Sequence, residues 1–134
     1  MPYFIEFVDV EKSFGETKVL NGISFGVEKG ETFAILGPSG VGKTVTLTLA
    51  VGLLKPDRGR IIVDGDDITE MNERELAHVR RKVQLVFQSG ALFDSLTVWE
   101  NVAFPLSDSG HTDRDIENKV DEYLKLVGSI KKIE

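Results

Sequence analysis

The sequence predicts an α/β fold, and three features of its pattern carry that prediction. Segments with apolar or alternating residues, typical of strands, fill the first part of the chain. A glycine-rich loop then lies between a strand and a helix, and the last part has apolar residues at helical spacing. With 134 residues, 41% of them hydrophobic, the chain can bury one modest core. We expect one continuous unit, because no repeat or linker divides it.

In chain order, the strands are expected at residues 4–10, 19–27, 32–36 and 60–63. Turns separate them at residues 14–15, 28–30 and 57–59. A helix is predicted from just after Gly42 to about Leu53, where Pro56 follows and cannot continue it. A strand therefore enters the glycine loop and a helix leaves it.

A second helix is predicted over residues 73–81, with Asn72 as N-cap and Glu75 placed to reach back to it. It leads into residues 83–87, an apolar run typical of a strand buried on both faces. A capping box of Thr97 and Glu100 begins a third helix.

Pro105 should stop that third helix, and residues 107–112 form a polar loop. A last helix follows, with Gly128 as its C-cap. One face of this helix is expected to be apolar, made by Ile116, Val120, Tyr123, Leu124 and Val127.

Composition excludes several classes of protein. There are 16 Lys and Arg against 22 Asp and Glu, a formal charge of −6, so no overall basic field favours nucleic acid as a partner. The absence of cysteine excludes disulfides, thiolate metal sites and a cysteine nucleophile, and it fits a reducing compartment. Because neither a signal peptide nor a long apolar run is present, we expect a cytoplasmic chain that does not span a membrane.

The strongest chemical signal is a run that matches the phosphate-binding loop pattern at each fixed position. Glycines let successive backbone N–H groups converge on a phosphate at the N-terminus of the following helix. The lysine should bridge the β- and γ-phosphates, and the threonine hydroxyl should bind Mg²⁺. The alternative is an ordinary glycine-rich turn between strand and helix. The run consists of Gly37, Pro38, Ser39, Gly40, Val41, Gly42, Lys43 and Thr44.

The segments around this loop resemble the nucleotide-binding subunit of ABC transporters over the whole chain. The similar segments are residues 10–15, 19–25, 55–59 and 86–88. The resemblance implies a P-loop NTPase core of the RecA-like type, with an antiparallel β subdomain and the start of a helical subdomain. Residues 1–88 would hold the β subdomain, the loop and a glutamine loop, and residues 89–134 the beginning of the helical subdomain. ATP and Mg²⁺ are the implied cofactors.

The resemblance also assigns roles to three residues outside the loop. Phe14 would stack on the adenine ring, although it could instead be a core residue between two strands. Gln88 would ligate Mg²⁺ or orient a water and act in catalysis together with Lys43, although it could simply face solvent at a strand end. Val45 departs from the family pattern of a second hydroxyl residue, but its backbone N–H is still expected to contact the nucleotide.

Three other polar residues are set aside. Asp64 ends an apolar run as a Mg²⁺-ligand aspartate would, but it comes too early and precedes Gly65. In the family pattern this stretch is a β-hairpin, so we reject Asp64 as a metal ligand. His78 is expected to be solvated on a charged helix, and His111 to lie in a polar loop.

Within the family, residues 87–106 are similar to the ATPases of Mla-type and Mce-associated lipid transport, some of which are known for toluene tolerance. This resemblance implies a transmembrane permease, a second ATP-binding subunit in a homodimer and a lipid-binding protein as partners. It places the chain on the cytoplasmic side of the cell membrane as a peripheral subunit. Leu92, Phe93 and Trp99 would meet the permease.

The family's signature loop, catalytic carboxylate and switch histidine find no counterpart in these residues, so the chain resembles the N-terminal part of such an ATPase. We expect it to bind nucleotide without hydrolysing it. Three readings stay open: an ATPase part of a lipid transporter, a nucleotide-binding module without turnover, and the ATPase of an importer for another solute.

Overall fold

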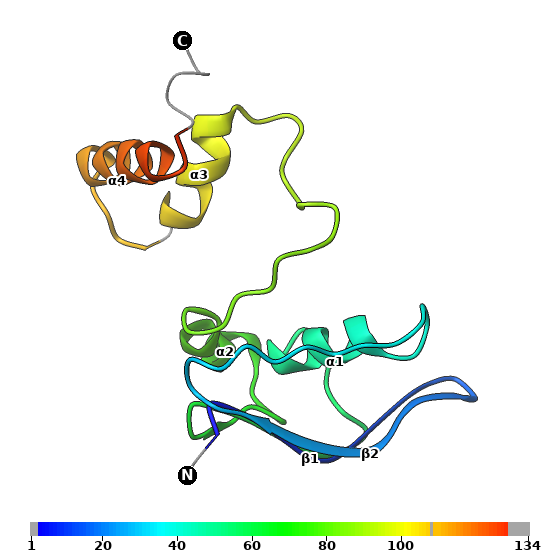
Figure 1. Ribbon diagram of the computed structural model, residues 1–134. Coiled ribbons are helices and arrows are strands. Elements are labelled where there is room, and N and C mark those ends of the chain that lie inside the picture. The colour runs from blue at the N-terminus through cyan, green and yellow to red at the C-terminus, as the bar shows by residue number, and fades with distance from the viewer. Residues whose placement is uncertain (1–2, 108, 129–134) are drawn as a thin grey trace. The chain divides into compact units, whose positions relative to one another are not determined.

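The computed structural model describes residues 3–107 and 109–128 and divides the chain into two compact units, Met1–Leu85 and Val86–Glu134. The first unit holds the strands and two helices, and the second holds two further helices (Figure 1). The elements in chain order are β1 (Ile5–Phe14), β2 (Thr17–Val27), α1 (Lys43–Ala50), β3 (Arg58–Val63), β4 (Asp66–Asp67), α2 (Glu73–Arg80), α3 (Val98–Ser107) and α4 (Asp113–Leu126).

The strands form one antiparallel sheet in the order β2-β1-β3-β4. Strands β1 and β2 are a long hairpin in which Phe7 lies opposite Phe25 and Phe14 lies opposite Thr17. On its other side β1 pairs with β3. These antiparallel pairings confirm the predicted antiparallel β subdomain. Apolar residues at alternate positions, such as Ile23, Phe25 and Val27 in β2, give the sheet one face that can be covered.

Helices α1 and α2 cover one face of this sheet (Figure 1). Their contacts with the strands bury the core of the first unit, because each helix contributes apolar residues from one stripe of its surface. The buried members are Phe7, Val10, Leu20, Leu49, Ala50, Ile61, Val63, Ile68, Leu76 and Val79.

Helix α2 begins as the sequence predicts. The Asn72 side chain accepts a hydrogen bond from the Glu75 N–H at 3.0 Å, and the Glu75 carboxylate accepts one from the Asn72 N–H at 2.8 Å. This reciprocal pair satisfies two backbone donors that a helix start otherwise leaves without partners. The predicted capping box is confirmed.

Strands β3 and β4 form a hairpin whose turn holds Asp64, with φ 49°, and Gly65, with φ 86°. This agrees with the β-hairpin on which the rejection of Asp64 as a metal ligand rests. Asp64 forms an ion pair with Lys82 at 2.7 Å. That contact lowers the pKa of the Asp64 carboxyl and raises the pKa of the Lys82 ammonium, so Asp64 is also a poor base.

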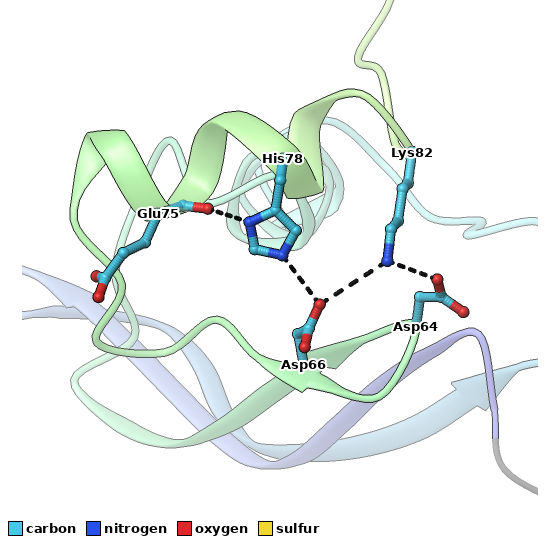
Figure 2. Close-up of polar contacts among 5 residues, drawn as sticks. All are labelled: Asp64, Asp66, Glu75, His78 and Lys82. Carbon is cyan, nitrogen blue, oxygen red and sulfur yellow. Dashed lines mark hydrogen bonds and ion pairs between the residues drawn. The ribbon is translucent and has the colours of Figure 1, made fainter.

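His78 is not merely solvated, which corrects the sequence prediction. As Figure 2 shows, the ring lies between helix α2 and strand β4. Its Nδ1 is 2.5 Å from the Glu75 carbonyl oxygen, and its Nε2 is 3.0 Å from the Asp66 carboxylate. The pattern of charged residues around His78 could not reveal this contact, because Asp66 belongs to another element. His111 lies in the predicted loop, with its Nε2 3.1 Å from Lys119 Nζ.

Helix α3 continues past Pro105 to Ser107, so the prediction that proline stops it is wrong. Proline removes one backbone donor but keeps a helical φ. The last turn is supported by Leu106, which packs on the core of the second unit, and by the Ser107 hydroxyl, which donates to the Ala103 carbonyl at 3.3 Å.

Helix α4 packs on α3 through a small core of Ala103, Val120 and Leu124, supported by Ile116. Tyr123 and Val127, also predicted on this apolar face, are exposed instead. The C-cap is Val127, one residue before the predicted Gly128. Gly128 follows it with φ 67°, a conformation common just after a helix end. In the described ranges, no helix combines the length and the apolarity that crossing a membrane needs.

Two predicted strands are not observed. Residues 32–36 and 83–87 have no ladder partner in the part of the chain that the structure describes. Several of their apolar side chains are exposed: Leu36 is 89% and Val86 87% exposed, and Phe33 is half exposed while stacking on Phe25 at 5.1 Å between ring centroids. Val83 instead packs against the core of the first unit. A strand needs neighbouring strands as hydrogen-bond partners, so composition alone could not determine these segments.

Candidate nucleotide-binding site

The glycine-rich loop is an open, exposed segment that ends at the first turn of α1. Residues 37–41 are exposed, and Gly42 is the N-cap of the helix with φ 101°. Only glycine fits there, since a Cβ atom would also lie 2.9 Å from side-chain atoms of Val19 and Leu20. No side chain caps this helix start, and its first turn carries no acidic residue. Its N–H groups can therefore receive an anion.

Lys43 folds back over the loop that precedes it. Its Nζ donates to the carbonyl oxygens of Gly37 and of Pro38, the latter at 3.0 Å. The ammonium group thus lies within the curve of the loop, next to the N-terminus of α1. A phosphate bound there would offer Lys43 negatively charged oxygens in place of neutral carbonyls, which makes stronger hydrogen bonds.

The residues after Lys43 divide between the loop and the core. Thr44 is exposed at the helix start, where a hydroxyl can reach a bound cation. Val45 instead packs against the core of the first unit, which gives its side chain an apolar role. Sequence analysis missed Thr46, which is buried and donates its hydroxyl hydrogen bond to the Gly42 carbonyl at 2.8 Å. The sequence did contain a signal for this bond, because a threonine hydroxyl in a helix can donate to the carbonyl four residues earlier and Thr46 lies four residues after Gly42.

Phe14 lies at the tip of the β1–β2 hairpin and is 47% exposed. It is not a member of the core, so the alternative of a core residue between two strands does not describe it. The Lys12 Nζ lies 5.5 Å from the centroid of the Phe14 ring, within the range of a cation–π contact.

The other predicted site residues belong to the second unit. Gln88 is exposed, as are Leu92 and Phe93, whereas Trp99 packs against the core between α3 and α4. The ring of Phe93 contacts that of Phe104, with centroids 4.8 Å apart.

Asn101 was not identified from sequence, yet it holds the loop before α3. Its side chain accepts a hydrogen bond from the Phe93 N–H at 2.8 Å and donates to the Phe93 carbonyl at 3.1 Å and the Thr97 carbonyl at 2.9 Å. These bonds determine how Leu92 and Phe93 are presented on the surface of this unit.

The loop fits a magnesium nucleotide better than a metal ion alone. Among residues 3–107 and 109–128 no group of three or more His, Asp or Glu side chains could hold a metal. Magnesium commonly keeps most of its ligands as phosphate and water oxygens, and then needs only one or two protein oxygens. Thr44 offers such an oxygen beside the amides that would hold the phosphates.

The glycine-rich loop, the open start of α1 and the Lys43 ammonium folded over the loop are the features of a P-loop nucleotide-binding site. The ABC transporter family model matches residues 20–133, and the chain belongs to that family. It is 43% identical over 123 residues to the spermidine/putrescine import ATP-binding protein PotA of Protochlamydia amoebophila, covering 92% of this chain and 32% of that protein. It is 42% identical over 127 residues to the probable ribonucleotide transport ATP-binding protein mkl of Mycobacterium leprae, covering 92% and 36%.

Solved structures agree with this assignment. The dimeric ATP-binding cassette MJ0796 in a post-hydrolysis state with ADP and Pi superposes with a TM-score of 0.79 at 30% identity, covering 90% of this chain and 56% of that one. CbiO1 of Clostridium perfringens, part of the transporter complex cbiONQ, gives 0.81 at 30% identity, covering 98% and 53%. The chain spans about a third of the length of the curated relatives it matches.

Proposed function

We propose that the chain is the ATP-binding part of an ABC transporter subunit that powers lipid or phospholipid transport through a membrane permease. The observation that carries the nucleotide-binding part of this proposal is the loop of residues 37–44. Its exposed backbone meets the uncapped start of α1, and the Lys43 ammonium lies within its curve. This arrangement offers hydrogen-bond donors and positive charge to one anion, which is what a nucleotide phosphate requires.

The residues of the site take different tasks in this proposal. The amides of residues 40–44 would hold the β-phosphate, the Val45 N–H would contact the α-phosphate, and Lys43 would bridge the β- and γ-phosphates. By resemblance to the family, Thr44 and Gln88 would supply oxygen ligands to Mg²⁺, and the bound ion would supply positive charge to the phosphates. Phe14 stacks on the base. Gln88 is a neutral amide, so it can orient a water but is a poor general base.

The same proposal assigns partners and location. The subunit works with a transmembrane permease, a second ATP-binding subunit in a homodimer and a lipid-binding protein, on the cytoplasmic face of the cell membrane. The dimeric state of MJ0796 supports the homodimer. No nucleic acid partner is proposed, in line with the charge of −6.

The transported solute has one specific alternative. Residues 87–106 favour a lipid, through their resemblance to lipid-transport ATPases. The relatives, however, include proteins named for spermidine/putrescine import and, at 41% identity over 119 residues, for methionine import in Carboxydothermus hydrogenoformans. An importer ATPase for a small solute is therefore the second candidate.

Transport by cells that carry the Lys43→Ala substitution in the chromosomal gene tests the substrate. We expect uptake of a labelled phospholipid to fall to the level of a gene deletion, because the permease loses its energy source. Labelled spermidine and methionine serve as controls in the same cells and should enter at the wild-type rate. Normal lipid transport with impaired uptake of either small solute would favour the importer.

Charged substitutions at Leu92 and Phe93 test the permease surface. Leu92 is 73% exposed, and Phe93 lies beside it in the loop that Asn101 holds. Apolar residues presented in this way can anchor a partner. In the full-length protein, Leu92→Glu with Phe93→Glu should prevent co-purification of the permease while ATP affinity stays unchanged.

Leu126 provides a matched control for this experiment, because it is an exposed leucine, 76% exposed, on helix α4 and not in the loop of Leu92 and Phe93. Leu126→Glu should leave the complex intact. A permease that still co-purifies with the double variant would show that the contact surface lies elsewhere. Trp99 is left unchanged here, since its substitution would disturb the core between α3 and α4.

A further inference from the structure

Asp57 connects the turn before β3 to the end of β1 through three polar contacts. Its carboxylate Oδ2 accepts a hydrogen bond from the Ser13 N–H at 2.7 Å, and its Oδ1 lies 3.5 Å from Lys12 Nζ. Its own N–H donates to the Glu11 carbonyl at 2.8 Å. One residue therefore holds three consecutive positions of β1 just before Phe14.

Lys12 extends this link to the aromatic ring. Its side chain is only 15% exposed, and its ammonium lies over the Phe14 ring at 5.5 Å from the centroid. The cation is thus held between the Asp57 carboxylate and one face of the ring. Because Phe14 is nevertheless half exposed, ring surface is left for another planar group.

The first residues of β3, which follow Asp57, lie close against β1. Gly59 has φ 84°, and a Cβ atom there would lie 2.4 Å from the Asp9 carbonyl oxygen. The backbone next to Asp57 therefore lies directly against β1, and the Asp57 N–H is itself bonded to that strand. The hydrogen bond from the Ser13 N–H, and to a smaller extent the nearby charge of Lys12, lower the pKa of the Asp57 carboxyl. The carboxyl is therefore charged at neutral pH.

We propose that Asp57 is a positioning residue for base recognition: it orients the hairpin end and Lys12 so that Phe14 presents one ring face to the base of a nucleotide. This inference rests on the proposed nucleotide binding. It assigns Asp57 no contact with the phosphates, which the loop of residues 37–44 holds. Substitution of Asp57 should therefore weaken the binding of nucleotides but not the binding of inorganic triphosphate, which has no base.

Paired titrations of the chain with Mg-ATP and with magnesium-bound inorganic triphosphate test this. Phe14→Ala should weaken ATP binding about 5- to 150-fold, the range for a lost stacking contact, and leave triphosphate binding unchanged. Asp57→Ala should weaken ATP binding about two- to tenfold, the scale of one hydrogen bond, again without affecting triphosphate. Triphosphate binding also verifies that each variant is folded.

Two further variants separate positioning from a general structural role. Asp57→Asn keeps an oxygen that can accept from Ser13, so it should lose less ATP affinity than Asp57→Ala. In the double variant with Phe14→Ala, loss of Asp57 should add nothing, because the ring that it positions is gone. Glu73→Ala is the control, since it removes an exposed carboxylate that is paired with Arg80 on α2.

The outcomes distinguish this inference from the function on which it rests. Equal losses for ATP and triphosphate, no loss with Asp57→Ala, or full additivity with Phe14→Ala would overturn the positioning role alone. A wild-type chain that binds neither ligand would overturn the proposed nucleotide binding and this inference with it.

Discussion

Lys43→Ala is expected to abolish binding of Mg-ATP and Mg-ADP by the chain. The ammonium lies within the curve of the loop, and no other cationic side chain comes from residues 37–44. Charge-assisted hydrogen bonds contribute about 1.5–3 kcal/mol each, so losing bonds to two phosphates weakens binding by more than about a hundredfold. Titration calorimetry with both nucleotides measures this loss directly.

Lys55→Ala is the matched control for this measurement. It removes another lysine of the first unit, which is half exposed and 3.8 Å from Glu70. We expect it to bind ATP as the wild-type chain does, and both variants should show the same melting curve by circular dichroism. Equal ATP affinity in the wild type and Lys43→Ala would refute the assignment of the phosphate site.

The second large effect is on turnover: a polypeptide of these 134 residues should bind ATP and release no phosphate above background. Hydrolysis needs a carboxylate that polarises the attacking water and positive charge at the γ-phosphoryl group. In the proposed site, Lys43, Thr44 and Gln88 would bind the ground state and the transition state equally well, and such uniform binding gives no acceleration. The one Asp-Glu pair of the sequence, Asp121-Glu122, is exposed on helix α4 and does not follow an apolar strand.

Steady-state phosphate release with and without Lys43→Ala tests this expectation. Both proteins should give the background rate, although only the wild type binds nucleotide. The ATP-binding cassette MJ0796, whose solved structure is a post-hydrolysis state with ADP and Pi, is run in the same assay to control for the detection of phosphate release. Strong release that Lys43→Ala removes would mean that a base has been missed, and Asp64 would be the first residue to test, by Asp64→Asn.

Local features of this chain could be predicted well from sequence. The capping box of Asn72 and Glu75 and the hairpin turn at Asp64 and Gly65 depend on residues within a few positions of one another. Their physical causes are a backbone N–H that needs a partner and a turn that needs positive φ. The phosphate-loop pattern likewise lies in eight consecutive residues, so its position at the start of α1 was predictable.

The roles of several site residues were harder to predict because they depend on burial. Leu92 and Trp99 were both expected on one contact surface, yet Leu92 is exposed and Trp99 packs between α3 and α4. Both are large and apolar, so residue type cannot separate them. Helix packing decides which one is covered. The effect of Pro105 also depends on tertiary contacts. Helix α3 continues past it because Leu106 packs on the core of the second unit.

The sequence by itself determined the phosphate-binding loop, the starts of α2 and α3 and the turn between β1 and β2, because each follows from neighbouring residues and backbone chemistry. Only the tertiary structure decided which segments join the sheet, since residues 32–36 and 83–87 have strand composition but no strand partner in the described ranges. It also decided the contact of Asp57 with Ser13, which are 44 positions apart. Such a contact depends on how the strands pair, and strand pairing is set by the burial of the whole sheet face.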